Sequence, residues 1–192
     1  MLRQFSLHQL GILPPLLIFV ALSLLPGGIC SSSSPSLWIS LNKSVTLSSL
    51  YSANDMPHHC TDGNLATQCR TKEARATGVI QHWTLDLGVV HRIDFIQFLI
   101  RPEDKFERFQ NVKIFVYNET GSFSETTASL CDWIVSEPVW GDYGGVKFYN
   151  STGCIDLHAR FIRVQMNGSH EDAYLHMKEV MVYGKGTERE RE

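Results

Sequence analysis

The feature of this chain that most limits its possible folds is a series of short runs of β-branched and aromatic residues. Gly, Asn, Asp and Ser separate these runs, and no long stretch shows the apolar period of a helix. In one run Phe161, Arg163 and Gln165 would point to one face of a strand and the residues between them to the other. The pattern predicts an all-β fold, either a β-sandwich or a jelly roll. The runs are 83–87, 93–100, 112–117, 133–135, 146–149, 161–166 and 179–183.

The tryptophans give a second expectation about the core. Trp83, Trp133 and Trp140 each lie in or beside an apolar run. Because aromatic side chains bury large areas, all three are expected to fill the interior of the sandwich.

The N-terminus has the pattern of a secretory signal peptide. Arg3 is its only early charge, an apolar run extends over 11–25, and the small residues Gly27 and Gly28 follow. Two prolines interrupt the run, which is shorter than the ~20 apolar residues of a spanning helix, so a permanent membrane anchor is disfavoured. We expect secretion of a soluble, extracellular chain.

Cleavage after Cys30 is the preferred site, because Gly28 and Cys30 are small residues at the cut. No block of charge or repeat divides the remainder, which suits one domain. The predicted organisation is a signal peptide at 1–30, a Ser-rich linker at 31–36, one β-sandwich domain at 37–184 and a charged tail at 185–192.

Charge and cysteine content limit the partners and the compartment. The chain has 17 Lys and Arg against 20 Asp and Glu, and only Arg3 would leave with the signal, so the mature charge is about −4. Nucleic acid is therefore not an expected partner. Four cysteines would remain after cleavage, an even set typical of disulfides in an oxidising compartment.

Those four cysteines allow three pairings. The close spacing of Cys60 and Cys69, and of Cys131 and Cys154, favours these two bridges. A zinc site is disfavoured because no pair has the short spacing of structural zinc ligands.

Four glycosylation sequons also fit a secreted glycoprotein. Each has the form Asn-x-Ser or Asn-x-Thr, and together they begin at Asn42, Asn118, Asn150 and Asn167.

Three local patterns resemble the fucolectin, or F-type lectin, branch of the galactose-binding-like, discoidin-related β-sandwiches. The first is Leu-Asn-Lys-Ser-Val-Thr-Leu-Ser-Ser-Leu-Tyr at 41–51, followed by Thr-Asp-Gly-Asn at 61–64. The second is Trp-Thr-Leu-Asp-Leu-Gly at 83–88, followed by a strand that ends in Arg101, and the third is Lys-Glu-Val-Met-Val-Tyr at 178–183. The resemblance covers about 37–184 and implies an eight-stranded jelly roll with ligand loops at one end.

The resemblance also implies a calcium ion beside the Asp-Gly-Asn turn. Asp62 and Glu179 offer hard carboxylate oxygens, and the turn can direct backbone carbonyls toward them. The alternative is that the turn is only a turn and Glu179 a solvated strand residue. A transition-metal site at the adjacent histidines 58–59 is disfavoured, because histidines in polar loops are usually solvated. The predicted calcium-binding residues are His59, Asp62, Asn64, Thr67, Lys178 and Glu179.

A sugar site is implied by the same family but is only partly retained. F-type lectins have a histidine upstream of an Arg-x-Asp segment and a second basic residue; here Arg101, Glu103 and Arg108 keep the spacing of the second part. Arg70 or Thr71 stands where the histidine is expected. Guanidinium groups donate several hydrogen bonds in fixed geometry, and an aromatic ring can support the C–H face of a sugar. The predicted ligand-binding residues are Thr71, Arg101, Glu103, Phe106 and Arg108.

No catalytic motif is present, so the chain is not expected to be an enzyme. The leading functional hypothesis is a secreted, calcium-stabilised, lectin-like module with a degenerate fucose-type site. Its partners would be glycans or cell-surface glycoproteins, with a homo-oligomer as a further option. The alternative is a discoidin-like module for protein–protein interaction or structure that has lost sugar binding; the absent histidine favours it, whereas the arginine spacing favours the lectin.

Overall fold

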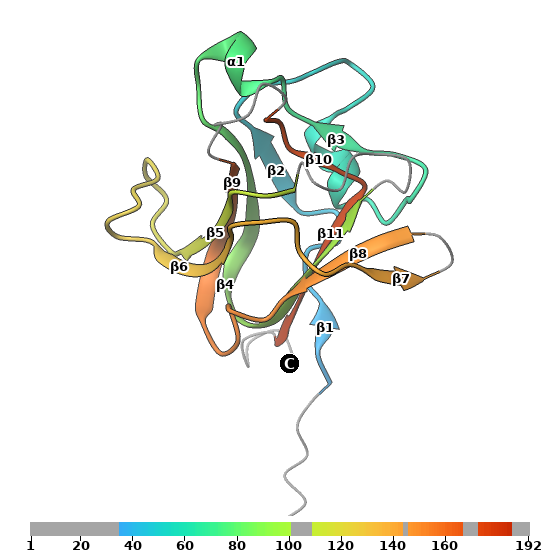
Figure 1. The fold of residues 1–192 in the computed structure, drawn as a ribbon. Helices are drawn as coiled ribbons and strands as arrows, with labels where there is room; N and C mark the ends of the chain where they lie inside the picture. Colours follow the sequence, from blue (N-terminus) through green and yellow to red (C-terminus); the bar gives the residue numbers. More distant parts are fainter. Residues whose placement is uncertain (1–34, 101–108, 144–145, 167–172, 186–192) are drawn as a thin grey trace, which may run out of the picture. The chain divides into compact units, whose positions relative to one another are not determined.

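The computed structural model describes residues 35–100, 109–143, 146–166 and 173–185, all within the compact unit Ser34–Glu192. The regular structure of the described residues is β apart from two one-turn helices (Figure 1). The strands are β1 (Leu37–Trp38), β2 (Ser44–Leu47), β3 (Cys69–Arg70), β4 (Gln81–Ile100), β5 (Val112–Tyr117), β6 (Ser129–Ile134), β7 (Gly141–Tyr143), β8 (Val146–Ser151), β9 (His158–Met166), β10 (His176–Met177) and β11 (Glu179–Lys185). The helices are η1 (Pro57–Cys60) and α1 (Ala74–Thr77).

The long strand β4 belongs to both layers of the sandwich. Its first half pairs with β2 and β9, and β9 continues through β5 to β6. Its second half pairs with β11 and β8, which continue to β1 and β7. All these pairings are antiparallel, so one nine-stranded sheet folds over into two layers. The predicted all-β, jelly-roll sandwich is confirmed.

A glycine marks the place where β4 passes from one layer to the other. The register of β4 against β9 shifts between Asp86 and His91, and Gly88 lies in that interval with φ +88°. Glycine adopts positive φ without the steric cost that a Cβ imposes. The two predicted runs 83–87 and 93–100 are therefore halves of one strand that bends at its centre.

The core lies between the two layers. Trp83 and Leu85 from the first half of β4 are fully buried, as are Ile96 and Phe98 from the second half. Burial of such a side chain stabilises the fold by roughly 1.5–3 kcal/mol. Fully buried residues of β9 and β11 complete it: Ile162, Val164, Val180 and Val182.

Trp133 does not fill the core as predicted, because it faces outward from β6. Its side chain is 52% exposed, while the next residue, Ile134, points inward and is 5% exposed. The register places Trp133 opposite Lys113, whose Nζ lies 5.6 Å from the centre of the indole ring. Trp140 is partly buried and packs on Phe109, with 5.7 Å between ring centres.

Both favoured disulfides are present. Cys60–Cys69 joins η1 to β3 with Cα atoms 5.4 Å apart. Cys131–Cys154 joins β6 to the connection between β8 and β9, with Cα atoms 4.7 Å apart. Asn42, Asn118 and Asn150 are exposed, as a glycosylated asparagine requires, while Asn167 lies outside the described residues.

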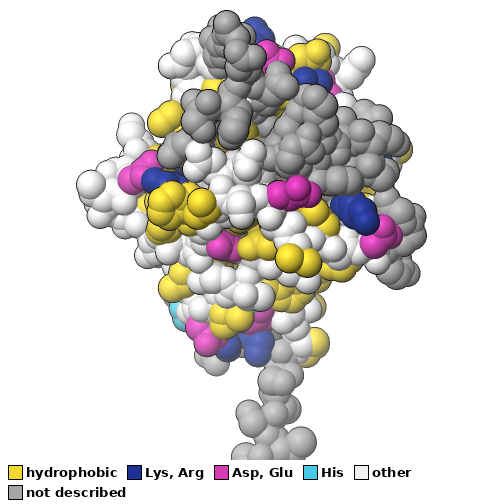
Figure 2. Space-filling model, in the orientation of Figure 1, with side chains coloured by type: hydrophobic (Ala, Val, Ile, Leu, Met, Phe, Trp, Pro, Cys, Tyr) yellow, Lys and Arg dark blue, Asp and Glu magenta, His cyan; other side chains and the backbone are white. Residues whose placement is uncertain are grey.

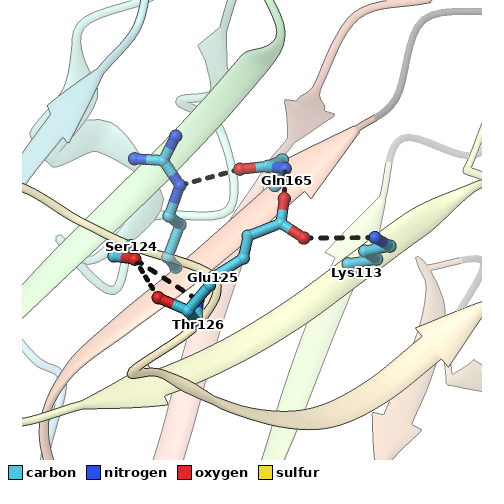
Figure 3. Close-up of polar contacts among 6 residues, drawn as sticks. Lys113, Ser124, Glu125, Thr126 and Gln165 are labelled. Atoms are coloured by element: carbon cyan, nitrogen blue, oxygen red, sulfur yellow. Dashed lines mark hydrogen bonds and ion pairs between the residues drawn. The ribbon is translucent and has the colours of Figure 1, made fainter.

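The connection between β5 and β6 folds back over the outer face of its layer. Glu125 accepts hydrogen bonds from Gln165 Nε2 at 2.6 Å and from Lys113 Nζ at 3.3 Å (Figure 3). Phe123 packs on Phe115, with ring centres 5.3 Å apart. Acidic and basic side chains of the described residues are interspersed on the face shown in Figure 2.

Candidate functional site

The Asp-Gly-Asn turn is closed by its own residues and tied to the last strand. Asp62 Oδ1 accepts the backbone N–H of Asn64 at 2.8 Å. Gly63 has φ +75°, and its N–H donates to Glu179 Oε2 at 3.1 Å. The left-handed conformation that glycine permits thus directs this N–H toward β11. The turn therefore lies against Glu179.

Acceptor oxygens converge on the hydroxyl of Thr67. Both carboxylate oxygens of Asp62 lie near Thr67 Oγ1, at 3.1 and 3.0 Å. The carbonyl oxygens of Asn64 and His59 lie at 2.7 and 3.4 Å from the same atom. One hydroxyl donates only one hydrogen, so it cannot satisfy four acceptors at once. This is the hard-oxygen environment that suits Ca²⁺.

Glu179 is buried at the same turn. It is 0% exposed, and its Oε1 has no hydrogen-bond partner. Burial raises the pKa of Glu179 to about 8; the nearby Asp62 charge acts in the same direction, and the Gly63 hydrogen bond opposes it. An unpartnered carboxylate oxygen in a buried place is costly unless a hydrogen-bond donor or cation meets it.

The predicted calcium-binding residues therefore fit the ion, with one distinction. The structure brings His59, Asp62, Asn64, Thr67 and Glu179 together. The Lys178 ammonium instead donates to the Leu65 carbonyl at 2.9 Å, so only its backbone carbonyl could serve a cation. Among the described residues no three His, Cys, Asp or Glu side chains form a metal cluster, and the site relies on carbonyl and hydroxyl oxygens.

Arg70 and the predicted ligand residue Thr71 lie at a small antiparallel ribbon. There β3 pairs with β10, placing Arg70 opposite His176. Thr71 is fully buried; its N–H donates to the Leu175 carbonyl at 3.0 Å, and its Oγ1 accepts the Leu175 N–H at 3.0 Å. Buried in this way, Thr71 holds the ribbon together and does not face a dissolved ligand. Arg70 is the partly exposed residue of the two.

Arg70 stacks on two tyrosines from distant parts of the chain. Its Cζ lies 3.7 Å from the centre of the Tyr51 ring and 4.1 Å from that of Tyr174. The Tyr51 N–H also donates to the Arg70 carbonyl at 3.2 Å. Arg70 Nε is buried and has no hydrogen-bond partner. Stacking uses the faces of a guanidinium group and leaves the Nη donors at its outer edge for a dissolved acceptor, which the buried Nε does not face.

Strand β4 ends beside this ribbon. β4 ends at Ile100, and the carbonyl of the preceding Leu99 accepts the Lys178 N–H at 2.8 Å, directly after β10. Figure 1 shows β3, β10 and α1 at one end of the sandwich and β1 at the other. Four predicted ligand-binding residues, Arg101, Glu103, Phe106 and Arg108, lie outside the described residues.

Sequence reasoning missed the two tyrosines. Tyr51 ends the first family-like pattern, and Tyr174 lies two residues before β10, but neither position has a chemical signature of its own. The signal in the sequence that could have led to this cluster is Arg70, which stands next to a cysteine in a short strand.

A small hollow at the end of β5 is a weaker candidate for a ligand site. It has a volume of about 210 Å³ and is lined by residues that include Tyr117, Asn118, Glu119 and His158. The Asn118 amide donates to the His158 carbonyl at 3.1 Å and belongs to a sequon. A glycan on Asn118 would cover this hollow, which disfavours it as a ligand site.

Solved jelly-roll sandwiches share the fold of this chain. A fucolectin from striped bass serum superposes with a TM-score of 0.62 at 22% identity, over 79% of this chain and 48% of that one. A fucose-binding module from Streptococcus pneumoniae gives 0.56 at 17% identity, over 78% and 99%. The family 32 carbohydrate-binding module of C. perfringens NanJ, solved with galactose, gives 0.54 at 19% identity, over 78% and 98%.

These likenesses confirm the fold that the sequence patterns suggest. The chain spans about half the length of the striped bass protein. No protein-family model and no curated protein sequence matches the chain.

Proposed function

We propose that this protein is a secreted, lectin-like carbohydrate-binding module whose ligand site surrounds Arg70 at the loop end of the sandwich. The observation that carries the proposal is the stacked arrangement of Arg70, Tyr51 and Tyr174. A sugar offers both hydroxyl oxygens and an apolar C–H face. The guanidinium donors suit the oxygens, and the exposed part of the Tyr51 ring suits the C–H face.

Specificity in this proposal differs from that of a fucose site. An arginine stands where the resemblance leads one to expect the lectin histidine, and Thr71 beside it is buried. The neutral imidazole acceptor of such a site is therefore missing, because a guanidinium only donates. We describe the site as a degenerate fucose-type site with altered chemistry. Arg101, Glu103 and Arg108 remain its proposed partners from the following segment.

Secretion is supported by the disulfides and by exposed sequon asparagines. Both bridges suit an oxidising compartment, where such bonds persist. No helix in the described part of the chain is long and apolar enough to cross a membrane.

Calcium is proposed as a structural ion. His59, Asp62, Asn64, Thr67 and Glu179 would hold it through oxygen atoms, together with the Lys178 carbonyl. The ion would supply positive charge to the converging oxygens and so tie the 59–67 segment to β11. The same segment leads directly into β3, so ordering it also orders Arg70.

A glycan array tests the proposed function. The secreted protein is applied with calcium and again with chelator, next to the Arg70→Gln variant. We expect specific glycans to be bound and Arg70→Gln to lower their signal, since losing a charged donor costs about 1.5–3 kcal/mol. An Arg92→Gln variant is the matched control, because Arg92 lies in β4 and pairs with Asp156 instead. Absence of glycan binding by the folded wild type would exclude the lectin function.

A protein-interaction function is the second candidate, and one observation favours it. Large hydrophobic side chains are exposed on or near strand β6, where Trp133 is 52% exposed and Val135 62%. Exposed apolar side chains of this size mark contact surfaces in many proteins. Replacing Trp133 with Ser should leave glycan binding unchanged and abolish such an interaction. Loss of glycan binding in that variant would instead place the sugar site on β6.

A further inference from the structure

We infer that the ligand of the Arg70 site is an anionic glycan, one that presents a carboxylate or a sulfate group to the guanidinium. This inference rests on the proposed carbohydrate-binding function and specifies its substrate class.

The first step concerns the missing counter-charge of Arg70. Among the described residues no carboxylate lies within ion-pair distance of its guanidinium, and Nε is buried without an acceptor. The nearest buried acid in sequence, Asp55, is already used: its carboxylate accepts Ser52 Oγ at 2.5 Å and Gln68 Nε2 at 2.7 Å. A cation that is partly removed from water and lacks a carboxylate partner gains most from an anion.

The second step is a further positive charge on the same side of the chain. Thr71 points into the core, and consecutive side chains of an extended segment alternate, so Arg70 and Lys72 point the same way. Lys72 is exposed and forms no ion pair with a described residue. Its backbone N–H donates to Ser49 Oγ at 3.0 Å, which fixes the segment beside the Tyr51 loop.

The third step is the geometry of the group that fits. The Tyr51 and Tyr174 rings stack on the guanidinium and hold the fork in place. A fork fixed in this way matches the paired oxygens of a carboxylate or sulfate, with two parallel hydrogen bonds. Tyr51 is 49% exposed, so an attached sugar ring can lie on it. An acidic sugar offers both an anionic group for Arg70 and a ring that can lie on Tyr51. A neutral sugar would leave the Arg70 charge without a counter-charge.

The experiment is an array on which each neutral glycan core is printed beside its sialylated, uronic acid and sulfated forms. The wild type should bind acidic forms at least about tenfold better than their neutral cores. Binding should weaken as sodium chloride is raised, because exposed charges are screened. Comparing the carboxylated with the sulfated glycans on the array shows which of the two anionic groups the site binds.

Variants connect that preference to the site. Arg70→Gln should remove the preference for acidic forms, with a loss of about tenfold or more. Arg70→Lys keeps the charge but loses the paired hydrogen bonds of the guanidinium. Its preference for acidic glycans should therefore lie between that of the wild type and that of Arg70→Gln. Arg92→Gln removes a matched charge elsewhere and should change nothing. Melting curves confirm folding; should Arg70→Gln fail to fold, Tyr51→Leu removes the exposed ring and should lower affinity for the same glycans.

The outcomes separate the inference from the function beneath it. Equal binding of neutral cores and their acidic forms would show that the inference is wrong while the lectin function stands. No binding to any glycan would remove both. Acidic preference that persists in a folded Arg70→Gln variant would also overturn the inference, since another cation would then read the charge.

Discussion

A single ion pair on the outer face connects two central strands. The Arg160 guanidinium donates to both carboxylate oxygens of Asp86, from Nε at 2.7 Å and from Nη2 at 2.8 Å. Asp86 also accepts the Gly88 N–H at 2.8 Å, at the point where β4 bends. One carboxylate thus ties β9 to the bend. The hydrogen bonds from Arg160 lower the pKa of Asp86, with burial acting in the opposite direction.

The Asp86 carboxyl gives a pH-dependent prediction. Because its folded pKa lies below its unfolded value of about 3.9, its contribution to stability is present above that value. The contribution is lost as pH falls through the lower folded pKa. Asp86→Asn should therefore lower the free energy of unfolding at pH 7. It should also make that free energy fall less steeply as the pH is lowered, which urea unfolding at several pH values measures.

Asp156→Asn is the control for Asp86→Asn. Asp156 is 64% exposed by its side chain and has φ +65°, which asparagine tolerates. Asp156 pairs with Arg92 at an exposed position, so an equal change of the acid limb in both variants would show that the effect is not specific to the Asp86–Arg160 pair.

At the same scale, the sequence groups the residues of the Asp-Gly-Asn turn, where calcium is proposed, but does not group the Arg70 cluster. Asp62, Asn64 and Thr67 stand within a few positions, so one turn motif is enough to group them. Tyr51 and Tyr174 are distant in sequence and meet Arg70 only through the β3–β10 ribbon. The size of an aromatic side chain predicts a buried Trp133, but residue type does not say which face of the edge strand β6 points inward, and Trp133 lies on the outer face.

Among the elements, the β8–β9 connection approaches β6 closely at a glycine. A Cβ built on Gly153 would lie 1.7 Å from the Cys131 carbonyl oxygen, a backbone atom that cannot move aside. The neighbouring Cys154 forms the disulfide with Cys131, so the two segments are fixed together. This close approach explains why the sequence has glycine here.

Gly153→Ala should therefore destabilise the fold by about 1–3 kcal/mol, the range for overpacking in a fixed environment. Chemical unfolding of the oxidised protein measures the change. Gly121→Ala is the matched control, because no atom lies within 4 Å of a Cβ at that position. Equal stability of the Gly153→Ala variant and the wild type would mean that the two segments separate easily.

The β5–β6 connection gives a second prediction at this scale. Glu125 joins it to β9 through Gln165 and to β5 through Lys113. Glu125→Ala should raise hydrogen exchange in the connection while the core strands keep their protection, because stability varies locally. Glu137→Ala, which removes an exposed acid elsewhere, serves as control. Unchanged exchange in the Glu125 variant would show that the Phe123 packing alone holds the connection.

For the whole molecule, strand periodicity predicted the class of fold, and motif order predicted its kind. The run 112–117 corresponds to β5, and the run 161–166 corresponds to the C-terminal part of β9. What periodicity could not give is that 83–87 and 93–100 form one strand shared by two layers. That property follows from tertiary pairing with β9 on one side and β11 on the other, and only Gly88 signals the bend in the sequence.

The stability of the whole domain should depend on calcium. An ion bound only by the folded state stabilises by mass action, by about 2.7 kcal/mol when its free concentration is 100 times its Kd. Calcium should therefore raise the melting temperature of the wild type, and Asp62→Asn should abolish the rise, because Asp62 supplies two of the converging oxygens. Asp156→Asn should retain it, and magnesium should have a smaller effect, since it requires a tighter octahedral shell. If chelator leaves the wild-type melting temperature unchanged, the oxygen cluster is a hydrogen-bonded turn only, and Glu179 Oε1 is a buried acceptor that the fold tolerates without an ion.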